Sequence, residues 1–289
     1  MYDLHTPTSD SDFSMIFVTR PDVLASRVPP PTEFNHHVHA PFASHKAGEI
    51  EYSGRELGRF LVELAKGNPK NVELLFTRKP HSSSAIWEEL RAMRRVFLTA
   101  RCARQYLGFI TERLHKASAE CGADATSFDG ASSRRFSKCL YHAYHRIFEL
   151  GRILDGGDPA VALSGCERSF VMDLRSRPPA FQGDVAAMLS EAESRRAVLA
   201  DRLDAACAAG EIPEEVDAEV LVAWLRSVRE RQARVVEGDA AENSGSPMAP
   251  PPTLPFPNSS SIGGGVASRT LDGEVGEVAG MPACTSAPR

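Results

Sequence analysis

Residues 9–18 read SDSDFSMIFV, and this short stretch decides how the rest of the chain is interpreted. Asp10 and Asp12 lie two residues apart, directly before an apolar run that is typical of a β-strand. Side chains at positions i and i+2 of a strand lie on the same face of a sheet. The sequence therefore predicts a strand that carries two carboxylates side by side at its start.

Two neighbouring carboxylates raise each other's pKa unless a cation lies between them. Mg²⁺ prefers hard oxygen ligands and needs only one or two carboxylates together with the phosphate oxygens of a substrate. A third acid on a neighbouring strand would complete a two-metal site for nucleotidyl transfer, and Glu51 lies in the next segment that could form a strand. The alternative is a turn in which Asp10 and Ser11 hydrogen-bond to their own backbone.

The composition is that of a globular protein with one large domain or two small ones. Of the 289 residues, 42% are hydrophobic and 25% are charged. The formal net charge is −5, which excludes a polycation, so any contact with nucleic acid requires a local basic face.

Six cysteines occur singly and none has the CxxC spacing of a zinc or redox site, so we expect isolated thiols in a reducing compartment. The N-terminus shows no signal-peptide pattern, and no apolar run approaches the roughly 20 residues of a membrane span. We expect a cytoplasmic protein that does not contact a membrane.

The N-terminal third alternates between strand and helix signals. Residues 20–47 are rich in Pro, His and Ser and predict a long loop, whereas residues 49–52 predict a short strand. Apolar residues recur at i, i+3, i+4 and i+7 over 57–64, which predicts a helix that ends at the Gly and Pro of residues 67–69. Residues 72–76, VELLF, fit either a strand or a further helical turn.

The remainder reads as helical up to a polar tail. Predicted helices cover residues 86–116, 135–154, 167–175, 183–209 and 216–236. After residue 238 the composition shifts to Pro, Gly and Ser, so we expect a disordered tail. The sequence thus predicts an α+β fold with a catalytic core over 1–84, an α-helical domain over 85–237 and a disordered tail over 238–289.

Several segments occur in an order that resembles a known family. They are SDSDFSMIFV at 9–18, KGNPKNVELLF at 66–76, QYLGF at 105–109, Lys138 with His142, DLR at 173–175 and Ile212 with Pro213. Their number and order resemble a family of predicted nucleotidyltransferases in the DNA polymerase beta-like superfamily, over about residues 2–236. The resemblance implies a partial nucleotidyltransferase-type mixed sheet followed by an α-helical domain.

The resemblance also implies a site. Asp10, Asp12 and Glu51 would bind Mg²⁺ as the catalytic carboxylates, with Glu51 where the family has Asp and with Glu49 as the competing choice. The nucleotide-binding residues would be Ser9, Lys138 and His142. The partners would be an NTP and an unknown acceptor, which could be RNA, protein or a small molecule.

The chain departs from the family pattern at its start. The family's Gly-Ser turn, which holds the triphosphate, would lie ahead of Tyr2 and Asp3, and the printed sequence does not contain it. Ser14 stands where the family often has an arginine. We expect either an N-terminally truncated enzyme, inactive as written, or a protein that has lost half of the site.

Two other classes of function stay open at this point. One is a non-catalytic nucleotide- or RNA-binding scaffold derived from such an enzyme, and the other is a helical interaction module. The basic residues over 86–116 suit either a phosphate channel or a solvated helix face. Histidines could bind a metal or serve structure, namely the pair His142 and His145 and the group His36, His37, His39 and His45.

Overall fold

The computed structural model describes residues 11–28, 30–38, 50–78, 80–120, 130–176 and 182–242. The chain divides into two units, residues 1–236 and 237–289, and the contacts given below lie within the first. Ser9, Asp10, Glu49 and most of the predicted tail lie outside the described residues. The domain boundaries expected at residues 84 and 237 stay predictions.

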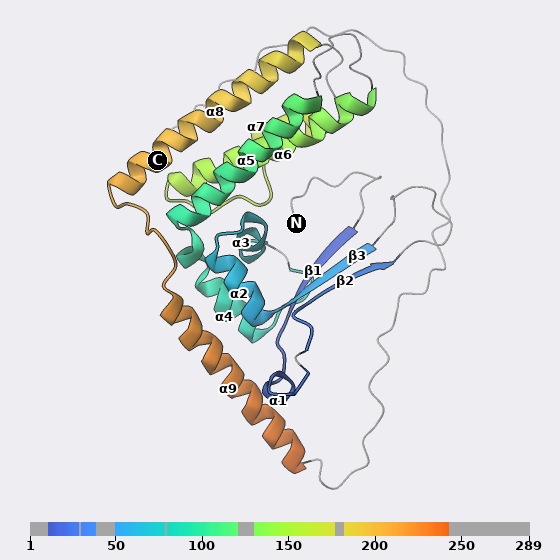
Figure 1. Cartoon of the computed structure of the whole chain (residues 1–289), viewed down its shortest axis with the longest axis vertical. Coiled ribbons are helices and arrows are strands. Elements are labelled where there is room, and N and C mark those ends of the chain that lie inside the picture. The colour runs from blue at the N-terminus through green and yellow to red at the C-terminus, as the bar shows by residue number, and fades with distance from the viewer. Residues whose placement is uncertain are drawn as a thin grey trace. The chain divides into compact units, whose positions relative to one another are not determined.

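A three-stranded mixed sheet forms the N-terminal part (Figure 1). Its central strand is β3 (Ile50–Glu56), which pairs parallel with β1 (Ser11–Phe17) and antiparallel with β2 (Glu33–Val38). The strands predicted after the acidic pair and around Glu51 are confirmed, and so is the α+β fold. The long loop predicted over 20–47 is wrong in part, since it contains β2 and the short helix α1 (Pro21–Leu24).

One face of the sheet carries aromatic side chains. Phe13 of β1 stacks on Tyr52 of β3, with ring centroids 5.3 Å apart, and Phe17 packs against Phe34 of β2 at 5.9 Å. Gly54 lies directly beneath Phe34, because a Cβ at this position would come within 1.9 Å of the ring. The glycine therefore leaves room for the aromatic ring of the neighbouring strand.

Helices make up most of the rest of the described chain. They are α2 (Leu57–Ala65), α3 (Pro69–Leu75), α4 (Ala85–Ala92), a 3-10 turn η1 (Arg94–Phe97), α5 (Ala100–Glu120), α6 (Gly130–Leu154), α7 (Gly165–Ser176), α8 (Gln182–Ala208) and α9 (Ala218–Glu242). The apolar stripe predicted over 57–64 is confirmed as the buried face of α2. Residues 72–76, left open above, belong mostly to α3.

The single helix predicted over 86–116 is wrong, because the chain turns between α4 and α5. The amides that begin α5 find acceptors far away in sequence, with Ala100 N donating to Pro213 O at 2.9 Å and Arg101 N to Glu214 O at 3.1 Å. Thr99 Oγ1 accepts from Cys102 N at 3.2 Å. The first amides of a helix have no partner within it, so these three bonds stabilise a new helix start at this place.

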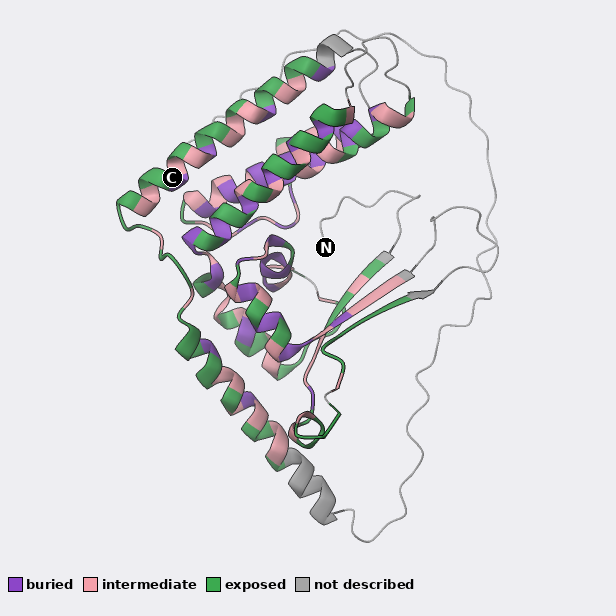
Figure 2. Cartoon of the chain, viewed as in Figure 1, coloured by how far each residue is buried: buried purple, intermediate pink, exposed green. Residues whose placement is uncertain are grey.

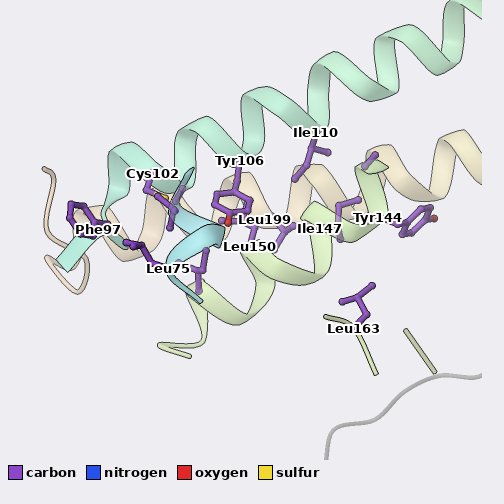
Figure 3. Packing of buried hydrophobic residues seen from close by; sticks show 14 of the residues in the cluster. Leu75, Phe97, Cys102, Tyr106, Ile110, Tyr144, Ile147, Leu150, Leu163 and Leu199 are labelled. Carbon is purple, nitrogen blue, oxygen red and sulfur yellow. The ribbon is translucent and has the colours of Figure 1, made fainter. Parts of the chain in front are cut away.

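The main core lies among α3, α5, α6 and α8. Figure 3 shows Leu75, Tyr106, Leu150 and Leu199, one from each of these helices, within one buried cluster. Buried residues follow one side of α5 and most of the length of α6, and alternate with exposed residues on α5 (Figure 2). Helix α6 is therefore the central element of the helical part.

The cysteines differ from one another in state. Cys102, Cys139 and Cys207 are free thiols, whereas Cys166 is disulfide-bonded. The expectation of isolated thiols is therefore wrong for Cys166. Burial and the nearby charge of Glu73 raise the pKa of Cys102 to about 12, so this thiol stays protonated.

Among the helices of the described ranges, none combines the length and the apolar character that crossing a membrane requires.

Gly67, in the turn that follows α2, tests the packing of that turn against α5. Its φ is +75°, and a Cβ there would lie 2.5 Å from Cys102 Cα. We expect Gly67→Ala to lower the free energy of unfolding by about 2 kcal/mol or more, because strain and a backbone clash add together. Urea denaturation measures this. Gly108→Ala is the matched control, since its Cβ meets open space within α5, and it should raise stability by up to about 1 kcal/mol. Equal stability of both variants would contradict the packing described.

Candidate functional site

Two of the three predicted acids lie on neighbouring strands, directly opposite each other. Asp12 of β1 and Glu51 of β3 are register partners in the parallel pair. Register partners on adjacent strands share a face of the sheet, with the strands about 4.8 Å apart. The pairing therefore brings Asp12 and Glu51, 39 residues apart in sequence, to one place at the start of both strands.

The face of the sheet that carries Asp12 and Glu51 has further polar side chains. At the opposite end of β3, one of them is hydrogen-bonded to helix α3. Ser14 and Ser53, the next register pair on this face, have their hydroxyl oxygens 3.3 Å apart. Arg55 follows on β3, and its Nη1 donates to Asn71 Oδ1 of α3 at 2.7 Å. The strand that carries Glu51 is thus fixed to α3 through Arg55.

Asp12 and Glu51 suit a hard divalent cation. Asp12 is exposed and Glu51 is partly exposed. Like charges directly opposite on a sheet repel, and a cation between them removes this cost. Mg²⁺ accepts two carboxylates with the rest of its shell from water or phosphate. The described residues contain no group of three or more acidic, His or Cys side chains able to hold a metal, and Asp10 lies outside them.

Strand β2 gives one of the histidines named above a place in the sheet that the sequence did not indicate. His37 stands opposite Glu51 in the antiparallel pairing, so one row across the sheet reads Asp12, Glu51, His37. His36 is the next residue and belongs to the other face. The sequence could not place His37 beside Glu51, because the local pattern does not show that residues 33–38 pair with β3.

Two of the residues expected to contact the nucleotide belong to the helical part and not to the sheet. Lys138 and His142 are one turn apart on α6, and α6 packs against α5, α7 and α8, whereas β1 and β3 pack against α2. Lys138 is exposed and His142 is partly buried. The structure places this pair together on α6, and among the described residues no contact joins it directly to Asp12 or Glu51.

The surroundings of His142 are positively charged. Burial, followed by the charges of Arg113, Arg146 and Lys138, lowers the pKa of His142 from 6.5 to about 3. Its ring packs on Tyr141 with centroids 4.4 Å apart. His142 is therefore a neutral imidazole at ordinary pH, surrounded by cations.

Most of the basic residues over 86–116 are paired with acids, which favours the solvated face over the phosphate channel. The pairs are Arg91 with Glu88, Arg94 and Arg95 with Asp158, Arg101 with Glu215, Arg104 with Glu214, and Lys116 with Glu112. A cation that already has an acidic partner contributes little free charge to a phosphate site.

A buried ionic cluster lies between α3 and α6. Arg146 Nη1 lies 2.6 Å from Glu73 Oε1 and 2.6 Å from Glu149 Oε2, and Tyr106 Oη donates to Glu73 Oε1 at 3.0 Å. Both carboxylates are fully buried. Burial would raise the pKa of Glu149, but the charges of His145 and Arg146 and their hydrogen bonds lower it below its usual value. Glu73 therefore connects α3 with Arg146 of α6 and with Tyr106 of α5.

His145 belongs to this cluster as well. Its Nδ1 lies 3.1 Å from Glu149 Oε2, and its Nε2 lies 3.1 Å from the carbonyl oxygen of Val161. Both ring nitrogens therefore have protein partners, and His145 ties α6 to the segment that precedes α7. This is the structural role weighed for the His142 and His145 pair, and it leaves His145 without a nitrogen for a metal.

Comparison with models of protein families, with curated proteins and with solved structures found no match to this chain. The resemblance to nucleotidyltransferases therefore stays a prediction from the sequence.

The buried cluster should dominate stability. Glu73→Gln keeps the shape of the side chain but leaves Arg146 with one carboxylate instead of two. Because a buried charge loses part of its compensation, we expect a loss of about 3 kcal/mol in the free energy of unfolding, measured by urea denaturation. Glu214→Gln breaks the exposed pair with Arg104 and serves as the control, with an expected loss below about 1 kcal/mol. Similar small losses in both variants would contradict a charged cluster.

His142 should make the fold sensitive to acid. In the folded chain the pKa of His142 is about 3, below its ordinary value of 6.5. Between these two pH values the unfolded chain therefore binds one more proton than the folded chain. Stability due to neutral His142 is present above pH 6.5 and is lost as the pH falls toward 3. We expect His142→Asn to gain at least about 1 kcal/mol relative to wild type between pH 7 and pH 4.5 in urea denaturation. The exposed His115→Asn is the control for the loss of a histidine. The same gain in His115→Asn, or no gain in His142→Asn, would refute the assignment.

Proposed function

We propose that the chain is a Mg²⁺-dependent nucleotidyltransferase that moves a nucleotidyl group from an NTP to an acceptor. The observation that carries the proposal is the pairing of Asp12 with Glu51 across adjacent parallel strands. Two carboxylates held on one face of a sheet suit a divalent cation that also binds phosphate oxygens. The order of segments in the sequence supports the same function.

Each residue has a role in the proposal. Asp10, Asp12 and Glu51 would hold the metal ions, with Glu51 serving the side of the acceptor hydroxyl. When bound, the metal neutralises the charge on the phosphates, which is most of what phosphoryl chemistry requires from a protein. Glu51 would be kept in place through Arg55 and Asn71, because these residues fix its strand to α3.

Ser9, Lys138 and His142 would contact the nucleotide. Lys138 is a compact point charge, a common ligand of phosphate. The acceptor remains open between RNA, protein and a small molecule, and a cytoplasmic location remains a prediction.

The activity is tested by pyrophosphate release. The protein is incubated with Mg²⁺ and labelled NTPs in the presence of RNA, protein or metabolite acceptors. We expect release that requires Mg²⁺ and falls at least about 100-fold in Asp12→Asn and in Glu51→Gln, because each change removes a carboxylate from the metal site. Asp10→Ala should behave in the same way.

Glu33→Gln is the matched control. Glu33 is an exposed carboxylate of the same sheet, on β2, where it pairs with Arg59 at 3.0 Å, and its loss should leave release unchanged. No release from wild type, or equal release from Asp12→Asn, would refute the proposal. Nucleotide or RNA binding without turnover, unchanged by Asp10→Ala, would instead identify the non-catalytic scaffold.

A further inference from the structure

The face of the sheet opposite to the candidate acids carries aromatic rings in register. Its rings, here called the aromatic face, are Phe13, Phe17, Phe34 and Tyr52. Phe13 and Tyr52 are register partners whose rings stack at 5.3 Å with an interplanar angle of 18°. His36 stands opposite Tyr52 on β2, so one row across the three strands reads Phe13, Tyr52, His36.

The aromatic face is open to solvent over much of its area. Phe34 is 37% exposed and its neighbour Met15 is 44% exposed, whereas Phe13, Phe17 and Tyr52 are partly exposed. Figure 2 shows the described parts of the three strands mostly as exposed and intermediate. Large apolar side chains that stay together at a surface mark a place where a ligand or partner binds.

The charge around the aromatic face is positive. Its one carboxylate among the described residues is Glu56, which is buried and accepts from Arg229 Nη2 at 3.2 Å. The ring of His81 packs edge-on against Phe13, with centroids 5.7 Å apart. His81 ends the basic run RKPH, in which Arg78 is exposed. Open rings bordered by cations suit a ligand that has both flat bases and phosphates.

We propose that the aromatic face binds single-stranded RNA, with bases stacked on the rows of Tyr52 and Phe34 and with phosphates beside Arg78 and His81. Stacking of bases on aromatic side chains is a main source of affinity for single strands and tolerates any sequence.

The spacing of the rows suits an unstacked strand. Phe34 lies opposite Gly54, two residues beyond Tyr52 on β3, which places the two rows about 7 Å apart along the strand. Stacked bases of a duplex strand are only about 3.4 Å apart. Bases held on the two rows are therefore splayed, as they are in the recognition of single strands by aromatic side chains.

The inference goes beyond the proposed function, because it concerns the face opposite to the acids. It holds whether or not Asp12 and Glu51 transfer a nucleotide. Only the choice of RNA over DNA rests on the proposed function, in which RNA is one of the open acceptors. His36 and the hydroxyl of Tyr52 supply polar groups for the 2′-hydroxyl that distinguishes RNA.

The test is fluorescence anisotropy of the whole chain with a labelled oligoadenylate RNA of about 12 nucleotides, without Mg²⁺. We expect Phe34→Ala and Tyr52→Ala each to weaken binding at least about fivefold, because each removes a ring on which a base stacks. Phe34→Tyr keeps the ring and should bind like wild type. Arg78→Gln should lower the slope of log affinity against log salt concentration by about 1, and Phe34→Ala should leave that slope unchanged.

A second measurement does not depend on removing a ring. Tyr52→Trp keeps an aromatic side chain on β3, and its fluorescence should fall when a base stacks on it. Wild type is the reference, since Trp87 and Trp224 lie on α4 and α9 and not on the sheet. The same fluorescence change in wild type overturns stacking at Tyr52.

Two controls separate this inference from the proposed function. Val198→Ala removes an exposed apolar side chain of α8 and should bind RNA like wild type. Asp12→Asn should also bind like wild type, because Asp12 lies on the opposite face. Failure of turnover alone overturns only the proposed function.

Three outcomes overturn the inference. Absence of binding, or binding by Phe34→Ala as tight as that of wild type, overturns the site. Equal affinity for DNA of the same sequence overturns the choice of RNA. Self-association of the chain that Phe34→Ala abolishes, without RNA binding, assigns the aromatic face to a second copy instead.

Discussion

The contact of Arg146 with Glu73 and Glu149 is the interaction on which the arrangement of this chain depends. A single guanidinium nitrogen lies 2.6 Å from a carboxylate of α3 and 2.6 Å from one of α6, in a place that excludes water. Charges of this kind are costly to bury and are tolerated only with their partners in place. The cluster therefore specifies how α3 lies on α6 more strictly than apolar packing alone would.

Helix α3 also contacts the sheet, so the ion cluster helps to fix the position of β3. It has only seven residues, five of them buried, and its Asn71 accepts from Arg55 of β3. The strand that carries Glu51 is thus held through Asn71 and Glu73 to Arg146, on the helix that also carries Lys138 and His142. One short helix therefore connects the strand of Glu51 with α6.

The sequence predicted what depends on local pattern. The apolar stripe over 57–64, the helix end at Gly67 and the strand after Asp12 were visible because each has a period or a breaker of its own. Strand β2 was missed, since Glu33–Val38 has mixed polarity and becomes a strand by pairing with β3. The break before α5 was missed because its amides are satisfied by carbonyls from residues 213 and 214.

The candidate site was predictable only in part for the same reason. Spacing indicated Asp12, and family order indicated Glu51, but only the strand register brings them together. The aromatic face was missed, because Phe34 joins it only through the pairing of β2 with β3. The buried cluster had a weaker signal, since Arg146 and Glu149 interrupt a mostly apolar face of α6.

The close approach of Gly67 to Cys102 has a consequence for following the molecule in solution. Cys102 is fully buried, and a thiol with a pKa of about 12 is almost never a thiolate near neutral pH. Alkylating reagents attack the thiolate, so they reach Cys102 only after the turn at Gly67 has moved away from α5. The rate at which Cys102 is labelled therefore reports how often the core opens, and the chain carries its own internal probe of that event.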